Sequence, residues 1–173
     1  MITEHSMKQG LHILEIGTGS GCIPISLYLN LDSAHITAVD ISSAAIDVAQ
    51  RNADRLGAAI EFSVFDFLDE SRWHELGQYD IIVSNPPYIP RARANEMQSR
   101  VKSYEPDLAL FVEDEDPFLF YKKTLSFAQS HLKSGGVVYF ETSQYEQLEV
   151  FEPFVLTSKK DMSGNVRFLK AGF

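Results

Sequence analysis

Short apolar runs alternate with helical patterns along this chain, and the alternation limits the fold more than any other feature. The runs of strand type cover residues 12–16, 36–39, 60–65, 80–84 and 137–140. Between them, apolar residues recur at the three- and four-residue spacing of helices. Strands and helices that alternate in this way pack as β-α units around a parallel sheet. The sequence therefore predicts an α/β fold.

Three longer helices are expected. The first covers about residues 22–29. The second begins after Ser42 or Ser43, whose hydroxyl groups suit a helix cap, and ends at Gly57. Its expected core face consists of Ala45, Val48, Ala49, Ala53 and Leu56. The third ends at Gly135-Gly136, and its expected apolar face consists of Phe118, Tyr121, Leu125, Ala128 and Leu132.

The C-terminal part predicts a short helix and a hairpin. The helix is expected near residues 144–151, and two strands are expected near Val155 and at residues 166–170. A turn through Ser163-Gly164-Asn165 joins these strands and adds an antiparallel strand to an otherwise parallel sheet. The sequence thus predicts a sheet of about seven strands, mostly parallel, with helices on both faces.

The composition is that of one globular domain. The chain has 173 residues, of which 45% are hydrophobic and 23% charged, so we expect a single domain over residues 1–173. No apolar run approaches the roughly 20 residues of a membrane helix, and the first ten residues lack the pattern of a secretory signal. Cys22 is the only cysteine, so no internal disulfide can form. These features predict a cytoplasmic protein.

The charge of the chain disfavours a protein that binds nucleic acid, and the spacing of its histidines disfavours a metal-binding protein. The net charge is −9, and the 15 lysines and arginines are scattered. A protein that grips nucleic acid through many phosphates usually has a basic face, so nucleic acid is disfavoured as a direct substrate. The five histidines show no spacing typical of metal ligands, and we predict no metal site.

A glycine-rich turn follows the first strand. It reads Glu15-Ile16-Gly17-Thr18-Gly19-Ser20-Gly21, and its alternating glycines let the backbone turn tightly and approach a ligand. Asp40 ends the next strand, 19 positions after Gly21, where a carboxylate can accept hydrogen bonds from two ribose hydroxyls. The pattern predicts a nucleoside cofactor, although a glycine-rich connection without a ligand is the alternative.

The spacing of the glycines distinguishes between cofactor classes. Nicotinamide sites use G-x-G-x-x-G, which Gly17, Gly19 and Gly21 do not supply. Glu15, before the turn, suits a cofactor with a positive sulfonium and an ammonium group better than a pyrophosphate.

Asp66 and Phe67 follow the third strand, at the rim of the same cleft. Asp66 is positioned to accept a hydrogen bond from an adenine amino group. Phe67 either flanks the adenine ring or packs in the core, and the sequence favours neither role.

The fourth strand ends in Asn85-Pro86-Pro87-Tyr88. An amide nitrogen is a poor nucleophile because its lone pair is delocalised into the carbonyl, so acceptors for both N–H groups would help it react. The Asn85 side-chain carbonyl and the Pro86 backbone carbonyl can serve as these acceptors, and Tyr88 offers a face for a planar group. Methyl transfer to such a nitrogen depends mainly on orientation and needs no strong general base. A tight strand exit without catalytic function is the alternative.

In order along the chain, the stretches EIGTGSG, VDIS and SNPPYIP resemble class I S-adenosylmethionine-dependent methyltransferases with an NPPY active site. Three further stretches resemble the release factor glutamine methyltransferases: SYEPDLAL from Ser103, FYK from Phe120, and KDMSG from Lys160 with Arg167. That family methylates the glutamine side chain in the Gly-Gly-Gln loop of peptide chain release factors. The resemblance implies a Rossmann-like class I fold, S-adenosylmethionine as cofactor and a release factor as partner.

The resemblance also implies residue roles. The cofactor would contact Gly17, Thr18, Gly19, Gly21, Asp40, Phe67 and Asn85, and the residue patterns described above add Glu15 and Asp66. The substrate glutamine would lie against Asn85, Pro86, Pro87 and Tyr88, with Asn85 as the principal catalytic residue, assisted by Pro86 and Tyr88.

The chain also departs from that family. Bacterial members have a helical N-terminal domain, whereas only about a dozen residues precede the first strand here, so we expect the catalytic domain alone. The main rival function is N-methylation of an exocyclic amino group of adenine or guanine in RNA or DNA, since the same strand end serves flipped bases. Three other functions are less favoured than this rival: methylation of a glutamine in another protein, methylation of a small molecule, and binding of partners without catalysis.

Overall fold

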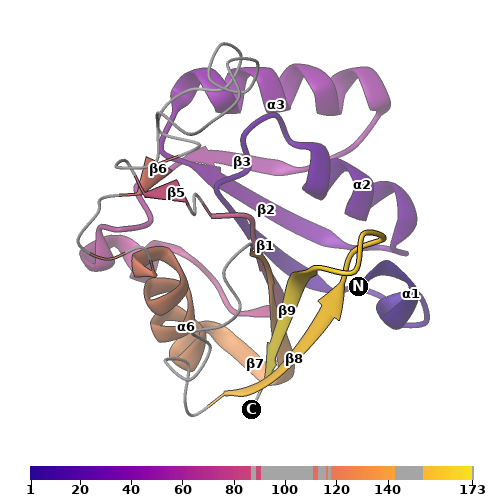
Figure 1. The fold of residues 1–173 in the computed structure, drawn as a ribbon. Helices are drawn as coiled ribbons and strands as arrows, with labels where there is room; N and C mark the ends of the chain where they lie inside the picture. The colour runs from indigo at the N-terminus through magenta and orange to yellow at the C-terminus, as the bar shows by residue number, and fades with distance from the viewer. Residues whose placement is uncertain (87–88, 91–110, 113–115, 117, 143–153, 173) are drawn as a thin grey trace.

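A seven-stranded sheet forms the centre of the molecule (Figure 1). The structure is a computed structural model that describes residues 1–86, 89–90, 111–112, 116, 118–142 and 154–172. The strands lie in the order β3-β2-β1-β4-β7-β9-β8. Their bounds are β1 His12–Ile16, β2 His35–Asp40, β3 Glu61–Val64, β4 Tyr79–Ser84, β7 Leu132–Glu141, β8 Val155–Lys160 and β9 Val166–Gly172.

Strand β9 is antiparallel to both of its neighbours, whereas the pairs on the other side of β7 are parallel. The C-terminal hairpin therefore adds one antiparallel strand, and the predicted seven-stranded, mostly parallel sheet is confirmed. A separate pair of short strands, β5 (Ile89–Pro90) and β6 (Phe111–Val112), lies outside this sheet.

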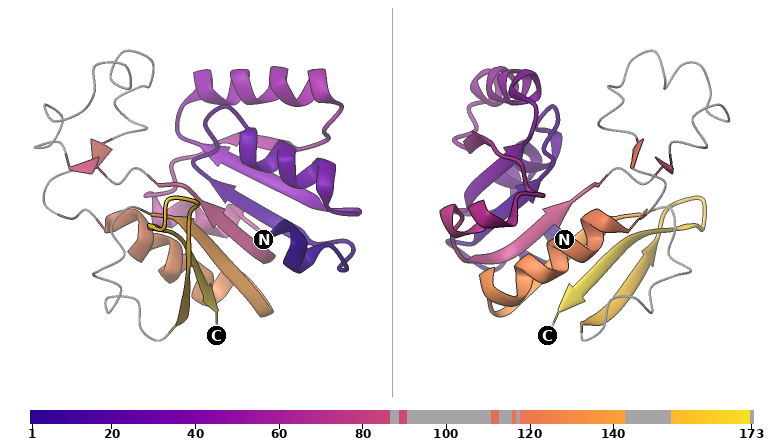
Figure 2. Two further views of the ribbon diagram at one scale, coloured as in Figure 1. Left: turned by 45° about the vertical axis from the view of Figure 1, so that its right-hand side comes forward. Right: turned by 90° about the vertical axis from the view of Figure 1, so that its left-hand side faces the viewer.

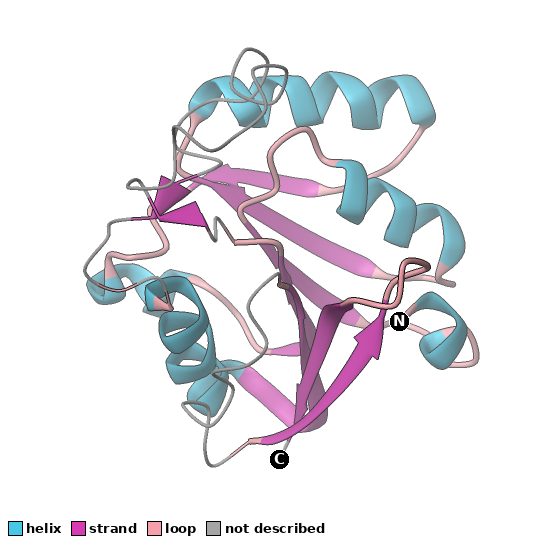
Figure 3. Ribbon diagram, in the orientation of Figure 1, coloured by secondary structure: helices cyan, strands magenta, loops and turns pink. Residues whose placement is uncertain are grey.

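Helices cover both faces of the sheet (Figure 3). The described helices are α1 Ile2–His5, α2 Cys22–Asn30, α3 Ser43–Leu56, the 3-10 helix η1 Glu70–Glu75 and α6 Leu119–His131. As predicted, α3 is capped by Ser42, whose hydroxyl accepts a hydrogen bond from Ala45 N, and ends at Gly57 in a left-handed conformation. Among the described helices, none combines the length and hydropathy of a membrane span.

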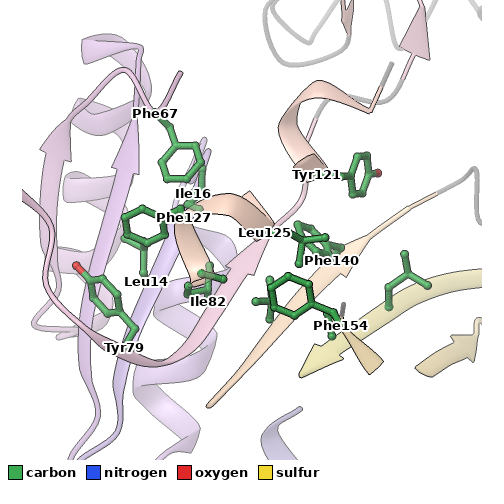
Figure 4. Close-up of a cluster of buried hydrophobic side chains, with 14 of the residues drawn as sticks. Leu14, Ile16, Phe67, Tyr79, Ile82, Tyr121, Leu125, Phe127, Phe140 and Phe154 are labelled. Carbon is green, nitrogen blue, oxygen red and sulfur yellow. The ribbon is translucent and has the colours of Figure 1, made fainter. Parts of the chain in front are cut away.

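Residues of the central strands β1, β2 and β4 belong to two different cores, because successive side chains point to opposite faces of a sheet. Leu14 of β1 belongs to a cluster with Phe127 of α6, whereas the neighbouring Ile13 belongs to a cluster with Leu27 of α2. Figure 4 shows the α6 side, where Leu14 and Ile82 lie beside Phe127. The strands read as continuous apolar runs because both faces are covered.

One predicted boundary is wrong. Helix α6 ends at His131, and the expected stop signal Gly135-Gly136 lies inside β7. The glycines serve an irregularity in the strand: Tyr79 pairs with Leu132, but Ile81 already pairs with Val137. A Cβ on Gly136 would lie 3.0 Å from the Asp80 carbonyl oxygen, and Gly135 has a φ of +72°, so glycine suits both positions.

The expected core face of α3 is only partly correct. Ala49 and Ala53 are fully buried, but Val48 is 37% and Leu56 is 51% exposed. Small residues therefore make the closest contacts of this helix, and Val48 and Leu56 extend toward solvent. The predicted helix near residues 144–151 lies outside the described residues.

Candidate active site

The strand order reverses between β1 and β4, and ligands of open α/β sheets bind outside the carboxyl ends of the strands at such a point. The two strands end level, because Ile16 pairs with Ser84. The buried Ser84 hydroxyl donates to the Ile16 carbonyl oxygen at 3.0 Å and ties the strand ends together. The glycine turn and Asn85 thus leave the sheet side by side.

Backbone hydrogen bonds fix the glycine turn against the end of β2. The N–H groups of Gly17 and Thr18 donate to the Val39 carbonyl oxygen at 2.9 and 3.0 Å. Gly19 N donates to one Asp40 carboxylate oxygen at 2.9 Å, and the other oxygen accepts from Ser42 N at 2.9 Å. Asp40 therefore joins the turn to the start of α3 while its side chain remains partly exposed.

The glycines of the turn differ in what surrounds them. A Cβ on Gly17 or Gly19 would meet no atom within 4 Å, so no described residue fills the space beside these two glycines. A Cβ on Gly21 would lie 3.0 Å from Ala49 Cβ and 3.3 Å from Ile25 Cδ1. The structure thus gives Gly21 a packing role between α2 and α3, in addition to its positive φ of +80°.

Glu15 is a buried carboxyl group under the turn. Its side chain is 2% exposed and accepts a hydrogen bond from the Thr18 hydroxyl at 2.5 Å. Burial raises the pKa of Glu15 to about 8, against the lowering effect of the Thr18 hydrogen bond, and the nearby Asp40 carboxylate raises it further. No ion pair joins Glu15 to a cation among the described residues. A positively charged ligand group would suit this carboxyl.

Asp66 and Phe67 lie at the same edge but face differently. Phe65 N donates to the Asp40 carbonyl oxygen at 2.8 Å, which brings the segment after β3 beside Asp40. Asp66 is partly exposed and accepts from Leu68 N at 3.0 Å. Phe67 is 4% exposed and stacks on Trp73, with ring centroids 5.5 Å apart. Of the two roles left open by the sequence, the structure supports core packing for Phe67.

The predicted substrate residues are described only in part. Asn85 is exposed and Pro86 is buried at the end of β4. Pro87, Tyr88 and the stretch that begins at Ser103 lie outside the described residues. Ser84, whose hydroxyl ties β4 to β1, was not among the predicted site residues; a small polar residue at the last position of an apolar strand was the available signal.

The described residues also form a hollow at the opposite ends of the sheet's strands, which lacks the chemistry of this edge. The hollow has a volume of about 1340 Å³ and lies at the amino ends of the strands, among His12, His35 and Tyr79. It is separated from the glycine turn by the length of the strands, roughly 15–20 Å, and holds none of the predicted site residues. In the described part of the chain, no three His, Cys, Asp or Glu side chains gather as metal ligands.

The sheet order, the glycine turn and the carboxylate at the end of β2 together define a Rossmann-like class I methyltransferase domain. The chain belongs to the family whose model is described as "Methyltransferase domain", which matches residues 7–166.

Among methyltransferases, the chain is similar in sequence to proteins of one type in particular. It is 43% identical to the release factor glutamine methyltransferase of Flavobacterium psychrophilum, over 97% of this chain and 60% of that protein. It is 45% identical to the release factor glutamine methyltransferase of Bacteroides thetaiotaomicron, over 76% of this chain and 47% of that protein. The chain thus spans about half to three fifths of the length of these relatives.

Solved structures confirm the fold. TrmN from Thermus thermophilus superposes with a TM-score of 0.70 at 20% identity, covering 98% of this chain and 46% of that one. The ribosomal protein L11 methylase from Lactobacillus delbrueckii subsp. bulgaricus gives a TM-score of 0.63 at 21% identity, covering 99% of this chain and 74% of that one.

Proposed function

We propose that this chain uses S-adenosylmethionine to methylate a glutamine side-chain amide, in the Gly-Gly-Gln loop of a peptide chain release factor. The observation that carries the proposal is the placement of Asn85, exposed at the end of β4 and level with the glycine turn after β1. The similarity to release factor glutamine methyltransferases, at 43% identity over nearly the whole chain, supports the choice of substrate.

The residues around the turn fit this cofactor. When bound, S-adenosylmethionine supplies an electrophilic methyl group on a positively charged sulfur. The buried Glu15, which has no ion pair among the described residues, would face its cationic amino-acid end, and the space beside Gly17 and Gly19 would admit it. Asp40 would accept hydrogen bonds from the ribose hydroxyls, and Asp66 would accept one from the adenine amino group.

Asn85 and Pro86 would prepare the substrate nitrogen. Their carbonyl oxygens would each accept one N–H of the glutamine amide, which fixes the direction of the lone pair. The nitrogen gains positive charge as the new N–C bond forms, and these preorganised acceptors stabilise that charge. The nitrogen then loses a proton to water, so the chain needs no strong base. Pro87 and Tyr88 would hold the planar amide in place.

The proposed substrate also suggests where and how the chain acts. Release factors work on ribosomes, so the reaction would take place in the cytoplasm. Residues 1–173 would act as one catalytic domain, without nucleic acid as a direct substrate.

The test is a methyl-transfer assay with radiolabelled S-adenosylmethionine, in which a bacterial release factor and total RNA are offered in parallel. Label is expected on the release factor, and replacement of its Gly-Gly-Gln glutamine by alanine should remove it. Label on RNA instead of protein would contradict the proposal and favour N-methylation of a base.

A further inference from the structure

The turn between β8 and β9 is held by a dense set of hydrogen bonds. One Asp161 carboxylate oxygen accepts from Ser163 N at 2.9 Å and from Asn165 N at 3.0 Å. Asp161 N donates to the Asn165 carbonyl oxygen at 2.8 Å, and Gly164 N donates to the Asp161 carbonyl oxygen at 3.1 Å. The Arg167 guanidinium lies 3.6 Å from the second Asp161 oxygen. These contacts tie both ends of the turn to Asp161.

Met162 lies at the tip of the turn and is fully exposed, with a relative accessibility of 107%. An apolar side chain of this size normally gains free energy by leaving water. Methionine is used repeatedly at protein-binding surfaces because its flexible, polarisable side chain adapts to different partners. A fixed turn that presents a whole methionine side chain to solvent is well suited to contact another protein.

The turn projects past the catalytic edge of the sheet. Phe168 of β9 pairs with Glu141 of β7, and Thr142 N donates to the Arg167 carbonyl oxygen at 2.8 Å. Residues 161–165 thus extend beyond the carboxyl end of β7. Because Phe140 of β7 pairs with Ser84, Asn85 lies two strands away, roughly 10 Å to the side at about 4.8 Å per strand. Figure 2 shows the hairpin tip and the end of β4 on the same side of the molecule.

Two lysines precede Met162 at the end of β8. Lys159 and Lys160 are exposed, and within the described ranges neither forms an ion pair. Both are cations on a chain with a net charge of −9. Such a surface complements an apolar segment with acidic neighbours.

We infer that the β8–β9 turn is a second contact for the protein substrate, with Met162 as its apolar anchor and Lys159 and Lys160 as its cationic flank. The inference rests on the proposed function, since it assigns this contact to the release factor beside its methylated loop. An exposed methionine beside only two lysines offers an apolar contact but too few cations to grip many phosphates, which favours a folded protein over nucleic acid.

The test compares methyl transfer to a whole release factor and to a short peptide that contains Gly-Gly-Gln. Met162→Ala and the double variant Lys159→Glu/Lys160→Glu should each raise KM for the release factor about tenfold, equivalent to about 1.4 kcal/mol. KM for the short peptide and Kd for S-adenosylmethionine should remain unchanged, because neither reaches the turn. Met7→Ala and Lys8→Glu are matched controls, since Met7 is 93% exposed and both precede β1 at the opposite edge.

The outcomes separate the two proposals. A wild-type chain that labels the release factor, with variants that keep the wild-type KM, would overturn the docking contact alone. Equal losses with the peptide and with the release factor would also overturn it, because the turn would then affect the catalytic centre. A wild-type chain that labels RNA, or leaves the release factor unlabelled, would overturn the proposed function and the docking contact with it.

Discussion

At the residue scale, the buried carboxyl group of Glu15 makes the stability of the chain depend on pH. The pKa of Glu15 is about 8 in the folded chain, against 4.5 in an exposed carboxyl, because the group is buried. The unfolded chain loses this proton first as pH rises. Protonated Glu15 thus contributes stability that is fully present below pH 4.5 and is lost as pH rises through about 8.

Glu15→Gln should remove this pH dependence, so the variant should become more stable than the wild type as pH rises toward about 8. Urea unfolding at several pH values measures the difference. Glu61→Gln, at an exposed position of β3, is the control. Wild-type and Glu15→Gln stabilities that change in parallel with pH would refute the raised pKa.

Because of the raised pKa of Glu15, we expect the chain to release a proton when the cofactor binds. Near pH 7 most free chains hold a proton on Glu15 because its pKa is about 8, and an adjacent cationic group favours the carboxylate. Titration calorimetry with S-adenosylmethionine, in buffers of different ionisation enthalpy, should show release of up to about one proton. Glu15→Gln should show none. Wild-type heats that do not depend on the buffer would contradict the contact.

Asp40→Ala should weaken S-adenosylmethionine binding by roughly 1.5–3 kcal/mol, the range for a lost hydrogen bond to a charged group. The variant also frees the Gly19 and Ser42 N–H groups, so the turn itself should loosen. Asp47→Ala, in the exposed part of α3, should leave Kd unchanged. A Kd for Asp40→Ala equal to that of the wild type would refute the ribose assignment.

At the scale of elements, α6 contains a buried polar group that its packing does not need. Thr124 is fully buried, and its hydroxyl has no hydrogen-bond partner among the described residues. Thr124→Val removes this hydroxyl at nearly constant shape, so the free energy of unfolding should rise by about 1 kcal/mol. Thr124→Ala also removes a methyl group and should gain less. Denaturant unfolding compares them, and a less stable valine variant would show that the hydroxyl is satisfied.

Elements were predictable where local chemistry decides them. The apolar run of β1, the Ser42 cap and the Gly57 stop of α3 each follow from residues within one turn or strand. The end of α6 could not be predicted in this way. Gly135 and Gly136 resemble a helix stop, but they lie at the irregular pairing between β7 and β4. That pairing joins residues more than fifty positions apart, which no local pattern records.

At the scale of the whole molecule, the residues of the candidate site could be predicted from the sequence, whereas the packing contacts around them could not. The glycine turn, Asp40 and Asn85 were recognisable as motifs, and the registers of β1 with β2 and with β4 bring them to one edge. The burial of Phe67 against Trp73, and the packing of Gly21 on Ala49, depend on contacts between distant segments and required the structure.

The central claim is that Asn85, at the end of β4, directs the substrate nitrogen toward the cofactor. The most direct test is the rate of methyl transfer to a release factor by Asn85→Ala, measured at saturating S-adenosylmethionine. The rate should fall on the order of a hundredfold or more, as when one preorganised hydrogen-bonding group is removed, while Kd for the cofactor stays nearly unchanged. Asn30→Ala, at the exposed end of α2, should keep the wild-type rate. An Asn85→Ala variant that retains most of the activity would contradict the account.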